Sequence, residues 1–238
     1  MDDVLSIVGL FGLYITLGIA ACLPLYHFSF QRLRVSVLWT KILWWIPIFA
    51  IFTLVVAFGL IPAILVVVLI LAGASREFIT HRAYRYISAN IYFVLFLIGL
   101  AHLPLYLVSQ KPNMLHALII VVFSSVLSDV FAFFFGKYLG RHKLPKQLND
   151  NKSWEGVIGQ IVGSILGGIA TATLLGLTYS MTLVAAIGIA SAVGDLFNSN
   201  TKRKINLKDW SQAIPGHGGF LDRFASLSFA LATGFWLY

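Results

Sequence analysis

Residues 42–74 read ILWWIPIFAIFTLVVAFGLIPAILVVVLILAGA, and this stretch carries no charged side chain. As a single helix it would be roughly 50 Å long, whereas the hydrocarbon core of a bilayer is about 30 Å thick. We therefore predict two membrane-spanning helices joined by a tight turn at residues 59–62, Gly-Leu-Ile-Pro. A chain with such a hairpin is expected to be an all-α polytopic membrane protein.

The composition of the whole chain supports the same class. Of 238 residues, 59% are hydrophobic and 11% are charged, whereas a soluble domain has about 25% charged residues. The first apolar run, residues 4–26, follows two aspartates and exceeds the roughly 7–15 apolar residues of a signal peptide, so we interpret it as a span. The single cysteine, Cys22, cannot form an internal disulfide.

The apolar runs predict about eight membrane-spanning helices. They are residues 4–26, two spans within 42–74, 87–108, 115–135, 154–175, 181–198 and 220–238. We divide the chain into four N-terminal spans (1–112) and a C-terminal catalytic region (113–238) with cytoplasmic loops at 137–153 and 199–219.

The cations of the chain predict its orientation. There are 17 Lys and Arg against 9 Asp and Glu, a net charge of +8, and nearly all the cations fall in alternate loops; Lys111 alone lies on the other side. The positive-inside rule makes the basic side cytoplasmic, so we expect a multi-pass protein of the bacterial inner membrane whose active site faces the cytoplasm. Cations in separate loops do not form the stripe of a nucleic-acid-binding domain, so we expect no nucleic acid partner.

Three carboxylates lie in or beside apolar runs, where charge is costly and usually marks function. They are Asp129, Asp195 and Asp222. Asp195 shares a helix face with Asn198, Ser199 and Lys202, which makes a polar stripe with the oxygen ligands that Mg²⁺ prefers. The alternatives are a packing carboxylate satisfied by nearby serines for Asp129, and a helix-start residue for Asp222.

The most polar stretch of the chain is residues 199–224, SNTKRKINLKDWSQAIPGHGGFLDRF. Its cations, and the backbone amides of a Gly-rich turn, suit a metal-chelated phosphate group. The cations could equally be a positive-inside anchor, and His217 a plain turn residue. A second polar cluster, Lys152, Ser153 and Glu155, lies where the helix at 154–175 begins, and a helix start is a natural anion site. Glu155 and Glu77 could also be merely interfacial.

Residues 199–224 resemble the signature of the phosphatidate cytidylyltransferases, the CDP-diacylglycerol synthases. The matching positions are Ser199, Lys202-Arg203, Lys208-Asp209, Ser211, Pro215, His217-Gly218-Gly219 and Asp222-Arg223. A second region of that family is similar to residues 129–136, Gly140, the basic run that follows it and residues 152–156. Gly194-Asp195-Leu196, before Ser199, also fits the family pattern. The resemblance covers the last four spans, and the first four match in hydropathy alone.

Three positions depart from the family pattern. Asn149-Asp150 replaces Ser-Pro, Asn198 replaces Glu, and Ala225 replaces the final Asp of the signature. The last change removes one expected metal ligand. It leaves open an engineered inactivating change, a divergent branch that uses Asp129 or Asp209 instead, and a non-catalytic member.

The resemblance implies that CTP and phosphatidic acid react, with Mg²⁺, to give CDP-diacylglycerol and pyrophosphate in phospholipid biosynthesis. It also implies a homodimer. The expected catalytic residues are Asp195, Lys202, Arg203, Lys208, Asp209, His217, Asp222 and Arg223. Lys152, Ser153, Glu155, Ser199, Gly218 and Gly219 are expected to bind substrate, and Asp195, Asp222 and, more weakly, Asp129 to bind the metal.

Three other functions stay open from the sequence. Intramembrane aspartates suit a cation-coupled transporter, although no inverted repeat is visible. Ala225 suits an impaired lipid- or nucleotide-binding member. A cytidylyltransferase acting on another lipid or polyprenyl phosphate is the third.

Overall fold

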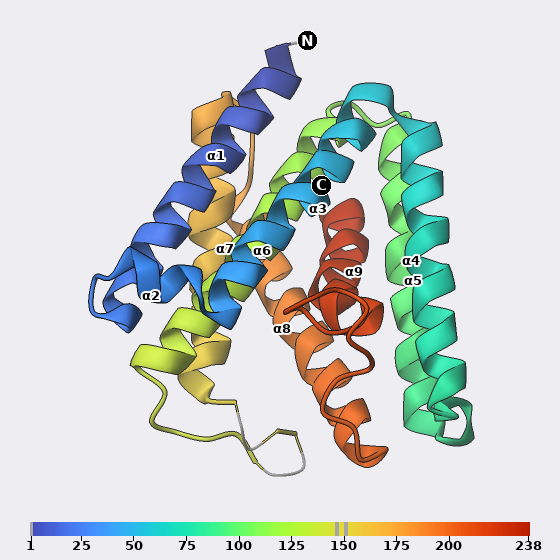
Figure 1. Ribbon diagram of the computed structural model, residues 1–238. Coiled ribbons are helices and arrows are strands. Elements are labelled where there is room, and N and C mark those ends of the chain that lie inside the picture. The colour runs from blue at the N-terminus through green and yellow to red at the C-terminus, as the bar shows by residue number, and fades with distance from the viewer. Residues whose placement is uncertain (1, 146–147, 150–151) are drawn as a thin grey trace.

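The computed structural model describes residues 2–145, 148–149 and 152–238, and within these ranges every regular element is a helix (Figure 1). The predicted all-α class is confirmed. The predicted loop 137–153 includes residues 146, 147, 150 and 151, which lie outside the described residues.

The helices follow one another with short connections. Their bounds are α1 Asp2–Cys22, η1 Leu23–Tyr26, α2 Phe30–Arg34, α3 Val37–Phe58, α4 Leu60–Thr80, η2 Ala83–Arg85, α5 Ile87–Val108, α6 Met114–Tyr138, α7 Trp154–Leu175, α8 Met181–Lys204 and α9 Phe220–Leu237.

The predicted hairpin within residues 42–74 is confirmed. α3 ends at Phe58 and α4 begins at Leu60, with Gly59 between them at φ 73°. A residue with a side chain is strained at this positive φ, whereas glycine adopts it readily. One glycine thus reverses the chain, and Pro62 falls in the first turn of α4, where its missing N–H costs no helical hydrogen bond.

Seven helices in the described part of the chain are long and apolar enough to span a membrane, one fewer than predicted. The missing one is α9, with 18 residues and with Asp222 and Arg223 in its first turn. It packs against α4, α5, α6 and α8. Since protein surrounds it, α9 does not need the uniformly apolar surface of a lipid-facing helix.

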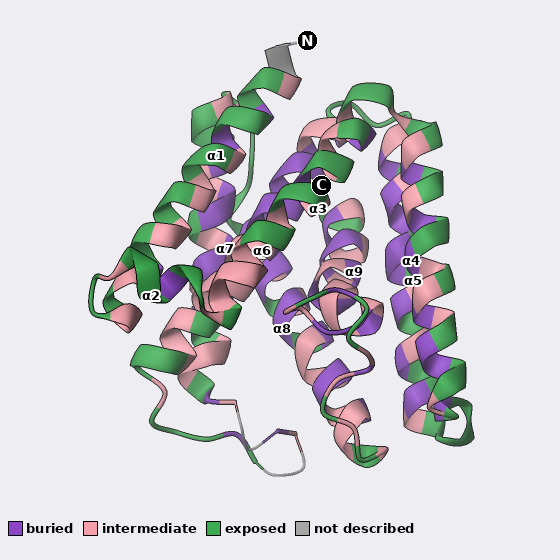
Figure 2. Ribbon diagram, viewed as in Figure 1, coloured by how far each residue is buried: buried purple, intermediate pink, exposed green. Residues whose placement is uncertain are grey.

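The helices differ in how much of their surface they bury (Figure 2). Within the apolar windows of the first span and of α3, 11% of the residues are buried, against 50% for α6. α6 is therefore an inner helix, while the first span and α3 lie on the outside of the bundle.

Among the described helices, α6 and α7 make the most extensive contact, and glycines make it possible. A Cβ on Gly163 would lie 2.4 Å from the Leu127 carbonyl oxygen, and one on Gly159 would lie 2.7 Å from Phe135 Cβ. Small residues four apart let two backbones approach closely, as in other membrane helix pairs. This pairing sets the start of α7 beside the end of α6.

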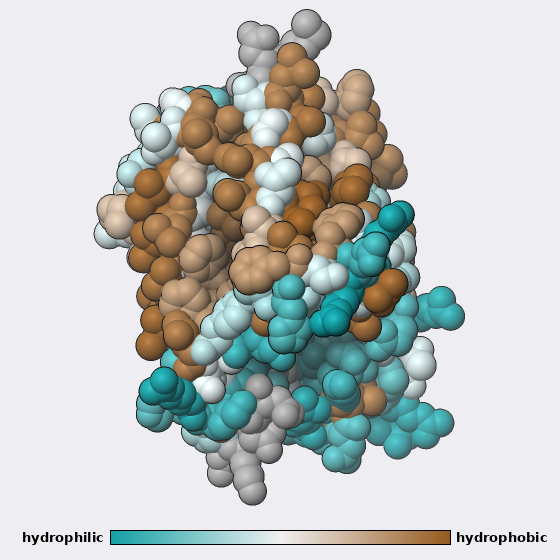
Figure 3. Space-filling model, turned by 60° about the vertical axis from the view of Figure 1, so that its left-hand side comes forward, coloured by the Kyte–Doolittle hydropathy of each residue, from teal (hydrophilic) through white to brown (hydrophobic). Residues whose placement is uncertain are grey.

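The basic connections lie together. Figure 1 shows the connections from α2 to α3, α4 to α5, α6 to α7 and α8 to α9 toward the end of the bundle away from the N-terminus. Figure 3 shows hydrophilic side chains over the lower part of the face it presents and hydrophobic ones above them. This arrangement agrees with the predicted topology, and the compartment that this end faces stays a prediction.

Gly99 on α5 tests the packing of α9. A Cβ at Gly99 would lie 2.3 Å from the carbonyl oxygen of Ser228, so Gly99→Leu should force the two helices apart. Overpacking of this kind costs about 1–3 kcal/mol, and we expect a lower thermal unfolding midpoint in detergent. Gly12→Leu is the control, since a Cβ at Gly12 meets nothing within 4 Å. Equal midpoints for the two variants would contradict the α5–α9 contact.

Candidate active site

The polar loop is fixed to the start of α9 by Asp222. Its Oδ2 accepts hydrogen bonds from the backbone N–H of Trp210 at 2.7 Å and of Gly219 at 3.0 Å. Its Oδ1 pairs with Lys202 Nζ at 2.5 Å, and the Asp222 side chain is only 7% exposed. A carboxylate here satisfies amides that the first turn of a helix leaves free. Both oxygens of Asp222 are therefore used in holding the loop.

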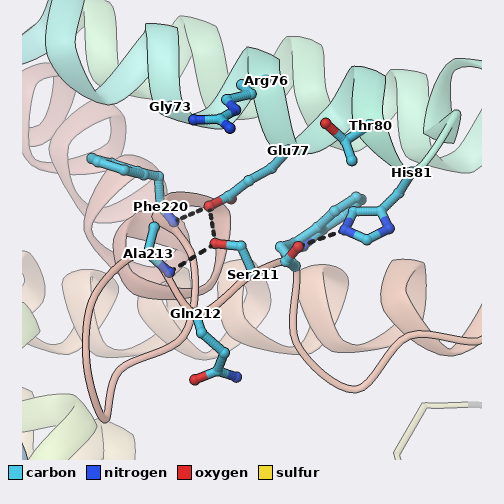
Figure 4. Close-up of a pocket in the computed structure, with 10 residues that line it drawn as sticks. Gly73, Arg76, Glu77, Thr80, His81, Ser211, Gln212, Ala213 and Phe220 are labelled. Atoms are coloured by element: carbon cyan, nitrogen blue, oxygen red, sulfur yellow. Dashed lines mark hydrogen bonds between the residues drawn. The ribbon is translucent and has the colours of Figure 1, made fainter.

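Glu77 on α4 is a second carboxylate at the same helix start (Figure 4). It accepts hydrogen bonds from Ser211 Oγ at 2.6 Å and from the backbone N–H of Phe220 at 2.8 Å and Leu221 at 3.0 Å. The sequence analysis left Glu77 as an interfacial residue, and no local signal pointed to these partners. In the structure it ties the N-terminal helices to the polar loop.

Gly218 and Gly219 have no side chain, and this leaves room for the carboxylates of Asp222 and Glu77. A Cβ on Gly218, which has φ 82°, would lie 2.9 Å from Asp222 Oδ2, and one on Gly219 would lie 2.4 Å from Glu77 Oε1. Since the Gly219 amide donates to Asp222, it is engaged within the protein. Substrate binding by Gly218 and Gly219 stays a prediction.

Trp210 anchors the middle of the loop. Its side chain is fully buried, and its Nε1–H donates to Asn198 Oδ1 at 2.8 Å. His81 Nε2 lies 2.6 Å from the Trp210 carbonyl oxygen. Asn198, one of the departures from the family pattern, therefore positions the loop.

The start of α7 is tied to α8 through Asp195. The Lys152 ammonium forms an ion pair with Asp195 Oδ2, and Gln160 Nε2 donates to the same oxygen at 3.4 Å. The Lys152 and Asp195 side chains are 28% and 30% exposed, so a ligand can reach them. Two regions that the family resemblance selected, far apart in sequence, thus meet in space.

The other predicted residues of this region have local partners. Ser153 Oγ accepts from the Gly156 amide and caps α7. Glu155 accepts from His142, with 2.6 Å between Oε1 and Nδ1. Both contacts order the segment before α7, and their predicted substrate contacts stay predictions.

Asp129 on α6 faces Arg223 on α9. The Arg223 guanidinium lies 4.0 Å from Asp129 Oδ2, and the Asp129 side chain is 27% exposed. Asp129 also lies within electrostatic range of Asp195 and Lys152. We call Asp129, Lys152, Asp195 and Arg223 the charge cluster, and it combines two carboxylates with two cations.

The described residues contain no group of three His, Cys, Asp or Glu side chains placed to hold one metal ion. Asp222, expected beside Asp195 in a metal site, is paired with Lys202 instead. Asp129 and Asp195 are the predicted ligands that the structure places within range of each other. The role of all three as metal ligands stays a prediction.

The remaining predicted residues are on the loop or at the end of α8. Arg203 donates to the Leu207 carbonyl at 3.1 Å, and Asp209 accepts from Gln212 at 3.5 Å. Lys208 is exposed and Ser199 is buried. Of these side chains, Lys208 is the one most open to a phosphate.

Ala225 marks where the family's last aspartate would be. It is 1% exposed, and a Cβ on Gly194 would lie 2.7 Å from its carbonyl oxygen. The position therefore packs against the residue that precedes Asp195, and the family's last carboxylate would lie close to the charge cluster.

Two residues on α3 that the sequence analysis did not select also lie here. Arg223 Cζ lies 3.8 Å from the Trp45 ring centroid, and the His217 ring lies 5.9 Å from it. Lys41, four residues before Trp45, contacts the loop, because a Cβ on Gly216 would lie 3.2 Å from Lys41 Cγ. Their spacing shows that they share a helix face, but nothing local identifies the loop as their partner.

Glu77→Gln tests the link between α4 and α9. The side-chain amide of the introduced glutamine has one acceptor oxygen, whereas the carboxylate of Glu77 has two. It also lacks the negative charge that stabilises the start of a helix. A buried donor left unpaired costs about 1–3 kcal/mol, so we expect faster hydrogen–deuterium exchange at the amides of Phe220 and Leu221 and a lower unfolding midpoint. Arg76→Gln, at an exposed neighbouring position, changes the charge equally and should leave both values unchanged. Unaltered exchange in Glu77→Gln would refute the link.

His217 predicts a pH dependence. Burial, reinforced by the positive charges of Arg223 and Lys41, lowers the pKa of His217 from 6.5 to about 3. The unfolded chain therefore binds this proton at a higher pH than the folded protein, and the folded state loses stability as the pH falls from about 6.5 toward 3.

Above pH 6.5 His217 is neutral in both states and contributes nothing to this slope. The unfolding midpoint of His217→Gln should fall less steeply between pH 6.5 and pH 4 than that of the wild type. Parallel curves would contradict the lowered pKa.

The sequence of the chain is similar to that of known proteins. A family model described as the cytidylyltransferase family matches residues 4–238. The chain is 32% identical over 131 residues to a phosphatidate cytidylyltransferase of Staphylococcus saprophyticus. This aligned stretch covers 53% of this chain and 50% of the relative. The chain is 35% identical over 142 residues to one of Brucella abortus, covering 58% and 53%.

A phosphatidate cytidylyltransferase of Staphylococcus aureus is 37% identical over 111 residues, covering 44% of this chain and 42% of the relative. The chain spans about half the length of the curated relatives it matches. The match to the family model extends over nearly the whole chain, and it confirms the predicted resemblance. The chain belongs to the cytidylyltransferase family.

Proposed function

We propose that this protein transfers the cytidylyl group of CTP to phosphatidic acid, which gives CDP-diacylglycerol and pyrophosphate. The observation that carries the proposal is the charge cluster, where cations from the start of α7 and from α9 lie beside carboxylates of α6 and α8. Partly exposed cations at the basic end of a membrane bundle suit two phosphate substrates, one from water and one from lipid. The family, and the names of the relatives, support the choice of cytidylyl transfer.

The reaction needs charge neutralisation more than it needs a base. An oxygen of the lipid phosphate forms a bond to the α-phosphorus of CTP, and the bond from that phosphorus to the bridging oxygen of pyrophosphate breaks. The attacking oxygen is already anionic at neutral pH, so positioning and electrostatic stabilisation supply most of the rate. Lys152 and Arg223 are the cluster cations suited to the phosphates, and the exposed Lys208 is suited to the nucleotide tail.

Asp129 and Asp195 fit a Mg²⁺ ion. They offer hard oxygen ligands within electrostatic range of each other, and Mg²⁺ in proteins is usually bound by one or two carboxylates together with substrate phosphates. When bound, the ion would neutralise phosphate charge. Asp222 fits less well, because both its oxygens hold the loop and Lys202.

His217 would contact phosphate as a neutral group. Its pKa of about 3 leaves the ring uncharged at pH 7. It can then donate one hydrogen bond without adding a third positive charge next to Arg223 and Lys41.

The site would face the cytoplasm from a bacterial inner membrane. The gathering of the basic connections at one end of the bundle supports this orientation. The homodimer is implied by the resemblance alone.

The test is turnover by purified protein in mixed micelles with CTP, phosphatidic acid and Mg²⁺. We expect release of pyrophosphate together with CDP-diacylglycerol, and a decrease of about 10²-fold or more in kcat for Asp195→Asn. Asp3→Asn, in α1, makes the same change of charge outside the charge cluster and the polar loop, so it is the matched control and should retain full activity.

Ala225→Asp restores the signature carboxylate and should raise turnover. Activity in Ala225→Asp alone would identify the present chain as an impaired family member. No product from either protein would refute the proposed function.

A further inference from the structure

A cavity of about 630 Å³ lies between the outer helices α1 and α3 and the inner helices α6 and α7. Its walls are almost wholly aliphatic and aromatic. Its charged and imidazole side chains are Lys41, Asp129, His217 and Arg223. The charge cluster and the cavity thus share Asp129 and Arg223.

The polar end of the cavity is built where α3 docks on the loop. Trp45 contacts both Arg223 and His217, and Gly216 packs on Lys41. Lys41 and Arg223 are also electrostatic neighbours. Two cations far apart in the sequence therefore lie within electrostatic range of each other.

These two cations are not fully neutralised by the protein. In the described part of the chain Lys41 has no carboxylate within ion-pairing distance, and Arg223 has Asp129 at the limit of 4.0 Å. Asp209 acts on Lys41 only at longer range. An anionic group placed between Lys41 and Arg223 would supply the missing charge.

The cavity also reaches the apolar outer surface of the bundle. Three of its lining residues are themselves well exposed, Leu17 at 56%, Leu166 at 48% and Phe133 at 41%. All three lie on helices long and apolar enough to span the membrane. An acyl chain can therefore enter sideways without leaving the bilayer.

We propose that this cavity is the lipid-substrate site, with an acyl chain between α1 and α6 and the lipid phosphate held by Lys41 and Arg223. The inference rests on the proposed function and assigns part of the site to the N-terminal half of the chain. CTP does not suit the cavity, since its charged and polar groups would meet aromatic walls.

The same geometry selects among headgroups. A phosphate monoester carries a charge of about −1.5 to −2 at neutral pH, which matches two cations. The choline cation of phosphatidylcholine would meet Lys41 and Arg223 with like charge and be repelled. Lys41 is then a specificity residue for phosphatidic acid.

Binding of lipid without CTP tests the proposal, with dioleoyl phosphatidic acid and dioleoyl phosphatidylcholine added to detergent-purified protein and retention read by native mass spectrometry. Gly18 lines the cavity, and a Cβ there meets nothing within 4 Å, so Gly18→Trp should fill the acyl path. We expect it to weaken phosphatidic acid retention about tenfold or more. Gly12→Trp, on the same helix and equally open, is outside the cavity lining and should bind like the wild type.

Lys41→Gln tests the headgroup end. We expect a loss of about tenfold in the preference for phosphatidic acid over phosphatidylcholine, with Arg34→Gln, an exposed cation on α2, unchanged. In turnover assays both cavity variants should raise the KM for lipid and leave the KM for CTP unchanged. Lys41→Gln shortens a lining side chain and leaves the apolar walls of the cavity unchanged, so it keeps the test valid if Gly18→Trp folds poorly.

The outcomes separate the two proposals. Selective phosphatidic acid binding that Gly18→Trp and Lys41→Gln abolish, in a protein without turnover, would support the cavity and refute the proposed reaction. Normal lipid binding and an unchanged lipid KM in both variants would refute the cavity, whether or not the protein turns over.

Discussion

The start of α9 lies inside the helix bundle, where its free amides cannot rely on water. A helix leaves its first four N–H groups without partners inside the helix, and leaving such groups unpaired in an apolar setting is costly. Asp222 and Glu77 supply the acceptors, one from α9 itself and one from α4. The arrangement of the polar loop follows from this requirement, because both carboxylates also bind loop residues.

These contacts bury the carboxylates of both Glu77 and Asp222. The carboxylate of Asp222 is compensated by a cation. Lys202 meets Asp222 in a pair whose side chains are 12% and 7% exposed. Removing one partner of such a pair typically costs about 3–5 kcal/mol, because the other charge is left uncompensated. The Lys-Arg element of the signature is thus partly structural. The side chains of the other pair, Lys152 with Asp195, are more exposed, at 28% and 30%.

Hydropathy and motif spacing predicted most of the helices. The bounds of α5 and α7 agree with the predicted spans 87–108 and 154–175. α8 runs six residues beyond the predicted end at 198, to Lys204, since cations end an apolar run but are favourable at a helix C-terminus. α9 was counted as a span because its sequence is mostly apolar, and its burial by other helices was not visible.

The sequence predicted a site residue only where that residue belongs to a recognisable motif. Spacing selected Asp195, Lys202 and Asp222, but it could not show that Asp222 would cap α9 instead of joining Asp195. Glu77 and the α3 pair of Lys41 and Trp45 were missed for one reason: their partners are far away in sequence. No helical or strand period connects residues that only tertiary packing brings together.

The distance between Glu77 and its partners also matters during biosynthesis. The carboxylate leaves the ribosome 143 residues before the Phe220 amide that it accepts from. Until α9 has been inserted, Glu77 has no helix start to cap and the loop has no anchor on α4. Docking of the start of α9 on α4 therefore has to wait for α9, and a nascent chain arrested before residue 220 would leave Glu77 without these two backbone donors.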